Sequence, residues 1–130
     1  MRTYSDMCIT AYWDARSGAE MPRVQEEEIN SLHAGVCAGL ADPKRIMILY
    51  ELADGPKNVT DLANALGLSQ PLTSRHLKVL RDRGMVTATR QGPAVLYTLG
   101  DPRLIEALDL LRAVLRDHLS RRVELLDHLS

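Results

Sequence analysis

Side chains that could do chemistry are concentrated between positions 69 and 78, where hydroxyl and amide groups come first and cations follow. The group consists of Ser69, Gln70, Thr73, Ser74, Arg75, His76 and Lys78. Such groups near the start of a helix can hydrogen-bond to base edges and phosphates, so we predict that all seven contact DNA. We expect His76 to meet a phosphate or a base edge rather than a metal. The sequence shows neither the spacing of a catalytic nucleophile and base nor a phosphate-binding glycine loop, and we expect no enzymatic activity.

A second set of residues that could bind a metal or react contains both cysteines of the chain. His33 and Cys37 are four residues apart and would share one face of a helix, where they could hold a metal or favour a reactive thiolate. Cys37 also fits the apolar face of that helix as a small buried hydrophobic residue, so both interpretations stay open. Cys8 is the other thiol of the chain, and together with Cys37 it could bind a thiophilic metal or metalloid ion or respond to oxidation.

Two helices joined by a tight turn must position the first group. Asn58 and Asp61 form a capped start, Gly67 supplies a left-handed helix end, and Ser69 caps the next helix. Apolar residues recur at helical spacing in both segments. In the first they are Val59, Leu62, Ala63 and Leu66, and in the second Leu72, Leu77 and Leu80. The spacing predicts a helix-turn-helix whose second helix lies in DNA.

A β-hairpin is expected directly after the second helix. Residues 85–90 and 94–99 have strand composition, and Gln91, Gly92 and Pro93 between them have turn chemistry. Arg90 is the cation in this hairpin, and we predict that it contacts DNA. Residues 67–100 carry five cations and one carboxylate, a net charge of +4, whereas the whole chain carries −1. DNA binding needs such a local basic face rather than a basic protein.

The remaining segments complete one small domain of 130 residues. Residues 1–24 have no sustained periodicity and contain three of the five aromatic residues, so we expect an N-terminal tail followed by a domain over 25–130. A first helix is predicted from Gln25 to about Leu40, and Asp-Pro pairs at 42–43 and 101–102 each begin another. The predicted fold is mainly α with a small β-hairpin, a winged helix-turn-helix in the order α-α-α-α-β-β-α.

The last predicted helix carries a leucine stripe, which in so small a domain predicts a partner surface. The stripe consists of Leu104, Leu108, Leu111, Leu115 and Leu119. Two cysteines 29 residues apart do not make a disulfide framework, and no apolar run reaches membrane-spanning length. The N-terminus lacks the pattern of a secretion signal. We therefore expect a cytoplasmic protein with no membrane partner.

These motifs resemble the ArsR/SmtB family of bacterial transcriptional repressors over about residues 29–119. The resemblance rests on LADPKRIMILYEL, on VTDLANALGLSQPLTSRHLKVLRDRGMV and on a wing ending VLYTL. It implies a homodimer whose first and last helices pair, bound to an inverted-repeat operator in double-stranded DNA. It also implies a repressor that leaves its operator when an effector binds or when thiols react.

Three effector sites known in this family are absent from the sequence. The Cys-x-Cys of soft-metal sensors matches Asn58 and Thr60, and the cysteines of persulfide sensors match Tyr50 and Arg116. The Asp-x-His of zinc and nickel sensors is replaced by Asp101 and an arginine two residues later. A second hypothesis is therefore a DNA-binding regulator without its own effector, controlled by a protein partner that docks on the N-terminal tail.

Overall fold

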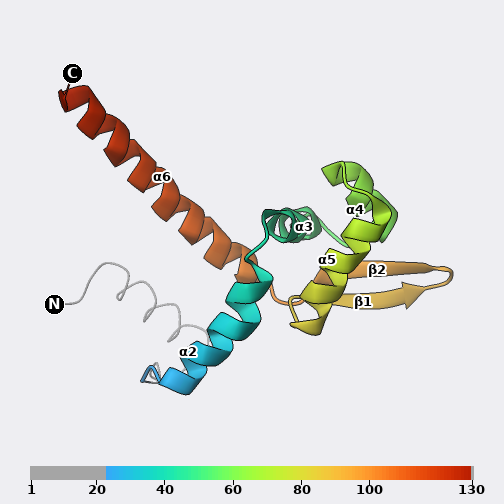
Figure 1. Cartoon of the computed structure of the whole chain (residues 1–130). Coiled ribbons are helices and arrows are strands. Elements are labelled where there is room, and N and C mark those ends of the chain that lie inside the picture. Colours follow the sequence, from blue (N-terminus) through green and yellow to red (C-terminus); the bar gives the residue numbers. More distant parts are fainter. Residues whose placement is uncertain (1–22, 130) are drawn as a thin grey trace. The chain divides into compact units, whose positions relative to one another are not determined.

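The computed structural model describes residues 23–129, which are mainly helical with one β-hairpin (Figure 1). The elements are α2 (Glu26–Leu32), the π-helical turn η1 (His33–Cys37), α3 (Pro43–Ala53), α4 (Val59–Leu66), α5 (Gln70–Asp82), β1 (Val86–Gln91), β2 (Ala94–Leu99) and α6 (Arg103–Leu129). Because α2 and η1 together make the predicted first helix, the predicted order is confirmed. The chain divides between His33 and Ala34 into two compact units. The predicted boundary between tail and domain at residue 24 stays a prediction.

Side-chain caps start the helices where the sequence predicts them. The Asp42 carboxylate accepts a hydrogen bond from the backbone N–H of Lys44 at 2.8 Å, and Asn58 accepts one from Asp61 at 2.8 Å. Ser69 accepts one from Leu72 at 3.3 Å. These bonds satisfy backbone donors that have no partner inside the helix. Gly67 ends α4 with φ +67°, a left-handed conformation that only glycine adopts at little cost.

The core of the second unit forms around α3. Its buried side chains come from α3, α4, α5, the start of β1, the residue before β1 and the start of α6. They are Ile48, Leu49, Leu52, Leu62, Leu77, Leu80, Met85, Val86 and Leu108. Arg45 reaches from α3 to the end of the preceding helix and donates to the carbonyl oxygens of Gly39 at 2.7 Å and Ala38 at 3.2 Å. The helix-turn-helix is therefore held on a rigid apolar base.

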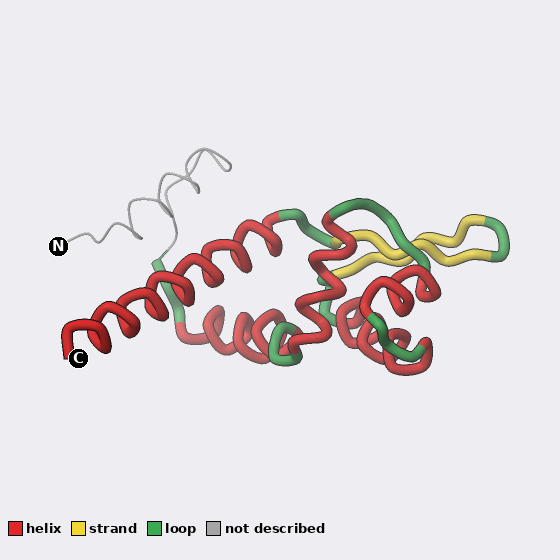
Figure 2. The backbone as a smooth tube through the Cα atoms, turned by 90° about the horizontal axis from the view of Figure 1, so that it is seen from above, coloured by secondary structure: helices red, strands yellow, loops and turns green. Residues whose placement is uncertain are grey.

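The hairpin is antiparallel, with Val86 opposite Leu99 and Gln91 opposite Ala94. Gly92 has φ +59°, while Pro93 can only adopt negative φ, so of the two tight hairpin turns only type II′ fits. Lys57 forms an isolated antiparallel bridge with Tyr97 on the other side of β2. Figure 2 shows the two strands extending together beyond α4 and α5 to the turn. The wing is thus a narrow ribbon anchored at its base.

Helix α6 is the longest element, with 27 residues. Leu108 is buried against the core and Leu104 is half-buried, whereas Leu111, Leu115 and Leu119 are exposed. The predicted stripe therefore begins in the core and continues onto the open surface of the protomer, where α6 extends away from α3 (Figure 1). Within residues 23–129, no helix is both long enough and apolar enough to cross a membrane.

Candidate nucleic-acid interface

The exposed face of α5 carries most of the predicted DNA contacts. Ser69 and Gln70 are exposed at its start, and Ser74, Arg75 and Lys78 are exposed further along. The opposite face holds Leu77 and Leu80, which are fully buried. Because helical residues three and four apart share a face, one side of α5 packs into the core while the other is open to a ligand.

Two of the residues predicted to contact DNA are buried in the protomer. Thr73 has no exposed surface, and its hydroxyl donates to the Ser69 carbonyl oxygen at 2.8 Å. His76 is 8% exposed, and its Nε2 is buried without a hydrogen-bond partner among the described residues. Both residues lie on the same side of α5 as Leu77 and Leu80, since positions 73, 76, 77 and 80 recur at helical spacing. That spacing was available in the sequence, but the polar residue types obscured it.

The buried His76 influences the pKa of Asp42, the residue that caps the start of α3. The hydrogen bond from the Lys44 N–H is the main reason that the pKa of Asp42 is lowered. The charges of His76, Arg45 and Lys44 lower the pKa further, and partial desolvation opposes them. The electrostatic influence of His76 on Asp42 indicates that this side of the recognition helix lies near the cap of α3.

Gln70 is held against the first helix of the motif. Its side-chain amide donates to the hydroxyl of Thr60 in α4 at 3.0 Å. A side chain fixed in this way loses less conformational entropy when it meets a base edge than a free one does. The bond thus links the two helices of the motif at the end that holds the predicted base contacts.

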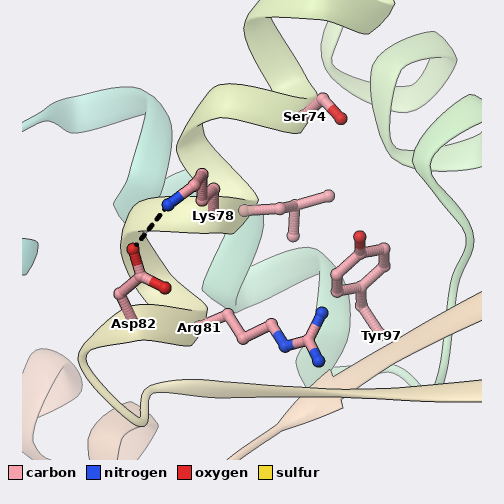
Figure 3. A pocket seen from close by; sticks show the side chains of 6 residues that line it. Ser74, Lys78, Arg81, Asp82 and Tyr97 are labelled. Carbon is pink, nitrogen blue, oxygen red and sulfur yellow. Dashed lines mark hydrogen bonds and ion pairs between the residues drawn. The ribbon is translucent and has the colours of Figure 1, made fainter.

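The cations on α5 differ in their surroundings. Lys78 pairs with Asp82 at 3.0 Å, one turn further along the helix, and both side chains are well exposed (Figure 3). Arg75 has no ion-pair partner within residues 23–129. An exposed ion pair of this kind contributes little stability, so a phosphate can compete for Lys78. Arg75 would give up no charged partner among the described residues if it bound DNA.

A cavity of about 440 Å³ lies between α5 and the wing. Its lining combines hydroxyls, two cations, one carboxylate and one leucine. The residues are Ser74, Leu77, Lys78, Arg81, Asp82 and Tyr97. Neither Arg81 nor Tyr97 is among the residues predicted from the sequence to form the site, although Arg81 contributes to the local positive charge. Tyr97 comes from β2, and nothing in the local pattern places it beside α5.

The wing offers one further cation. Arg90 is exposed on β1, opposite Val95 and next to the turn. The hydroxyls of Thr87 and Thr98 lie 2.6 Å apart across the strands and support the base of the ribbon. Pro93 stands at the tip, where it contributes no charge and no N–H donor. Any contact between the tip and DNA therefore depends on Arg90.

The thiol region is only partly described by the structure. Cys37, at the end of η1, is exposed, so the interpretation of this residue as a buried core cysteine is wrong for the protomer. His33, at the start of η1, is exposed as well, and Cys8 lies outside the described residues. In the described part of the chain, no group of three or more histidine, cysteine or acidic residues could hold a metal ion.

Two of the family's sensor positions have other partners here. The Arg103 guanidinium binds the Asp101 carboxylate through Nη2 at 2.6 Å and Nε at 3.0 Å. The Tyr50 hydroxyl donates to Asp109 at 2.7 Å, and burial and this bond raise the pKa of Tyr50. The Arg112 guanidinium lies 5.2 Å from the centre of the Tyr50 ring. The contacts of Tyr50 with Asp109 and Arg112 join α3 to α6, whereas the pair of Asp101 and Arg103 is local to the start of α6.

Residues 42–88, which include the whole helix-turn-helix, match the family model of the bacterial regulatory proteins of the arsR family. The chain is 36% identical over 107 residues to the uncharacterized HTH-type transcriptional regulator Rv0081 of Mycobacterium tuberculosis, a match that covers 82% of this chain and 94% of the relative. The chain belongs to the ArsR family. The crystal structure of Rv0081 superposes with a TM-score of 0.66 at 38% identity, covering 73% of this chain and 96% of that one.

Two further comparisons bear on function. A probable mercury resistance operon repressor of Streptomyces lividans is 37% identical over 79 residues, which is 61% of this chain and 63% of the relative. The chain spans a little under two thirds of the length of this repressor and of several other curated relatives. The solution structure of Mb0332 from Mycobacterium bovis, a homodimeric winged helix-turn-helix DNA-binding domain, superposes with a TM-score of 0.64 at 28% identity. That match covers 78% of this chain and 95% of that one.

Proposed function

We propose that this ArsR-family protein is a homodimeric transcriptional repressor that binds an inverted-repeat operator with α5 in the major groove. This proposal rests on the exposed polar and basic face of α5, which lies on a buried apolar base next to the wing. In a helix-turn-helix of this kind the second helix reads base edges while its surroundings hold the backbone. Such a regulator acts in the cytoplasm, where bacterial DNA lies.

The proposed DNA contacts are the exposed members of the predicted set. They are Ser69, Gln70, Ser74, Arg75, Lys78 and Arg90. The residues at the start of α5 face base edges, and Lys78 and Arg90 face phosphates. Arg75 is the residue best suited to a bidentate contact with guanine, because its guanidinium is a planar fork with no competing carboxylate among the described residues.

Dimerisation is supported by the apolar surface of α6. Leu111, Leu115 and Leu119 continue a stripe that starts in the core, and each is about half exposed or more in the protomer. An apolar stripe of this length on one protomer calls for a matching surface, and a second copy supplies one through two-fold symmetry. Two recognition helices would then meet half-sites about one helical turn apart, near 10 base pairs from centre to centre.

The proposed effector is a thiophilic metal or metalloid ion, or an oxidant, acting on Cys37 together with Cys8. Exposure of Cys37 supports this proposal, as does the likeness to a repressor whose name refers to mercury resistance. Thiolate ligation near the first helix would change how two subunits pack. DNA affinity falls tenfold if the ligated protein prefers the non-binding arrangement by about 1.4 kcal/mol.

Binding to the DNA upstream of its own gene tests the repressor proposal. We expect a dimer to protect an imperfect inverted repeat in a footprint, and a scrambled repeat to serve as the control. A protein that sediments as a monomer at micromolar concentration, or that protects no specific sequence, would contradict it.

The effector proposal is tested by release from that operator, followed as fluorescence anisotropy, with arsenite, cadmium, mercuric ion and peroxide. Wild type should be released by at least one of them, while Cys37→Ser and Cys8→Ser should bind DNA normally but resist release. An equal response of wild type and both variants would place the sensor elsewhere. No response from any of them would favour control by a protein partner.

A further inference from the structure

We propose that the cavity between α5 and β2 holds one phosphodiester of the DNA backbone, with Arg81 and Tyr97 as its principal ligands. The inference rests on the proposed function and adds a contact site to it. Neither residue belongs to the row of predicted base contacts, and the site joins the recognition helix to the wing at a single phosphate.

The walls of the cavity come from two elements. Ser74, Lys78 and Arg81 follow one another at helical spacing along the exposed side of α5, and Tyr97 faces them from β2. Figure 3 shows the side chains of Arg81 and Tyr97 converging on the same space between the helix and the strand. Leu77 forms the apolar part of the lining. The donors therefore surround a space that opens beside the DNA-facing side of α5.

The charges of the lining suit a single monoanionic group. The cations are Lys78 and Arg81, and Asp82 is the one acid among the lining residues, which leaves a net charge of +1. Asp82 already engages Lys78 at 3.0 Å. Arg81 has no ion-pair partner within residues 23–129, so it is the cation that faces an incoming anion. A guanidinium can bind both non-bridging oxygens of a phosphodiester at once.

Tyr97 is a positioned donor rather than a mobile surface residue. Its backbone pairs with Ala88 on one side, and on the other it exchanges two hydrogen bonds with Lys57, at 2.8 and 3.1 Å. The phenol is therefore carried by a residue of β2 whose backbone is paired on both sides. A hydroxyl held in this way gains more from binding a phosphate than one that must first be ordered. The hydroxyl of Ser74 adds a second neutral donor on the helix side.

Because a backbone contact is independent of sequence, a duplex of arbitrary sequence, about 30 base pairs long, serves as the probe. Each phosphate contact contributes about 0.9 to the slope of log affinity against log salt. We expect Arg81→Gln to lower affinity about tenfold and to reduce this slope by about 0.9. Tyr97→Phe should lower affinity about threefold with little change of slope, since it removes a neutral donor. Arg116→Gln, on the polar side of α6, is the charge-matched control and should change neither.

The double variant tests whether the two residues share one phosphate. Once Arg81 is replaced, Tyr97→Phe should cost less than it does alone, because the phosphate is no longer held in the cavity. Circular dichroism confirms that each variant is folded. Independent losses, or an unchanged salt slope in Arg81→Gln, would overturn the shared site while leaving the proposed function intact. A wild-type protein that binds no duplex would overturn both.

Inorganic phosphate distinguishes a DNA contact from a site for free anions. At matched ionic strength it should displace the duplex no better than chloride does. Stronger displacement that disappears in Arg81→Gln would identify a free-phosphate site and overturn the assignment to the DNA backbone.

Discussion

Arg75 lies on the open side of α5 and has no carboxylate partner in the described part of the chain. We expect Arg75→Ala to weaken specific binding by about 1–3 kcal/mol and to relax preference at one base pair, because a bidentate guanine contact is lost. The measurement compares the operator with random DNA for wild type and variant. Equal losses on both kinds of DNA would contradict a base contact and point to a phosphate.

Lys78 and Asp82 form an ion pair, and replacing one should have the opposite effect on DNA affinity from replacing the other. Lys78→Ala should weaken binding to all sequences and reduce the salt slope by about one unit. Asp82→Asn removes the competing carboxylate and a charge that repels phosphates, so it should strengthen binding to operator and random DNA alike. Glu124→Gln, an equal change of charge in α6, is the control. If Asp82→Asn and Glu124→Gln have the same effect, the gain reflects net charge rather than release of Lys78.

The cap of α3 predicts a pH-dependent stability. The pKa of Asp42 is lowered from 3.8, mainly because its carboxylate accepts the Lys44 N–H bond. A lowered folded pKa means that the ionised cap stabilises the protein above the unfolded pKa, and that this contribution is lost as pH falls through the folded value. Asp42→Asn keeps a capping oxygen without the charge.

We therefore expect Asp42→Asn to melt below wild type at pH 7, and the difference to disappear as the pH falls below about 3.8. Asp42→Ala, which removes the oxygen as well, should stay less stable at both pH values. Thermal unfolding at several pH values measures the stability difference between wild type and each variant. A gap between wild type and Asp42→Asn that does not change with pH would show that the carboxylate charge has no role.

At the scale of elements, the turn between α4 and α5 depends on one backbone conformation. Gly67 has φ +67°, and a Cβ added there would meet nothing within 4 Å. Gly67→Ala should therefore destabilise the protein through its backbone conformation and not through a clash with neighbouring atoms. We expect a loss of about 1 kcal/mol in the free energy of unfolding.

Gly67→Asn is the matched variant, since asparagine tolerates the left-handed conformation better than alanine does. Chemical denaturation should rank the three proteins as glycine, asparagine, alanine in order of decreasing stability. If alanine and asparagine are equally destabilising, the turn is limited by something other than the sign of φ.

At the scale of the whole molecule, the exposed stripe of α6 predicts the oligomeric state. Leu111→Glu together with Leu115→Glu should give a folded monomer, because both side chains are more than half exposed in the protomer and lie outside its core. Sedimentation measures the mass, and binding to a complete operator should weaken strongly. Ser120 lies about 180° around the helix from Leu111, so Ser120→Glu should leave the dimer intact. A dimer that survives the double substitution would place the interface elsewhere.

Much of this architecture was predictable from the sequence, because its determinants are local. Caps at Asp42, Asn58 and Ser69, and the glycine at 67, act within three or four residues of themselves. They define where helices begin and end without reference to the rest of the chain. The helix order, the hairpin and the apolar side of α6 follow from such signals and from hydrophobic periodicity.

The tertiary structure alone decided which polar residues face outward and which meet. Thr73 and His76 have the chemistry of DNA contacts, yet the packing of α5 against its neighbours buries them, and Cys37 is exposed although it fits an apolar position. Tyr97 lines a cavity with Arg81 because β2 folds back beside α5, and Tyr50 bonds to Asp109 across 59 positions of sequence. Residue type and local period fix the face of an element, but the direction of that face depends on contacts between distant parts of the chain.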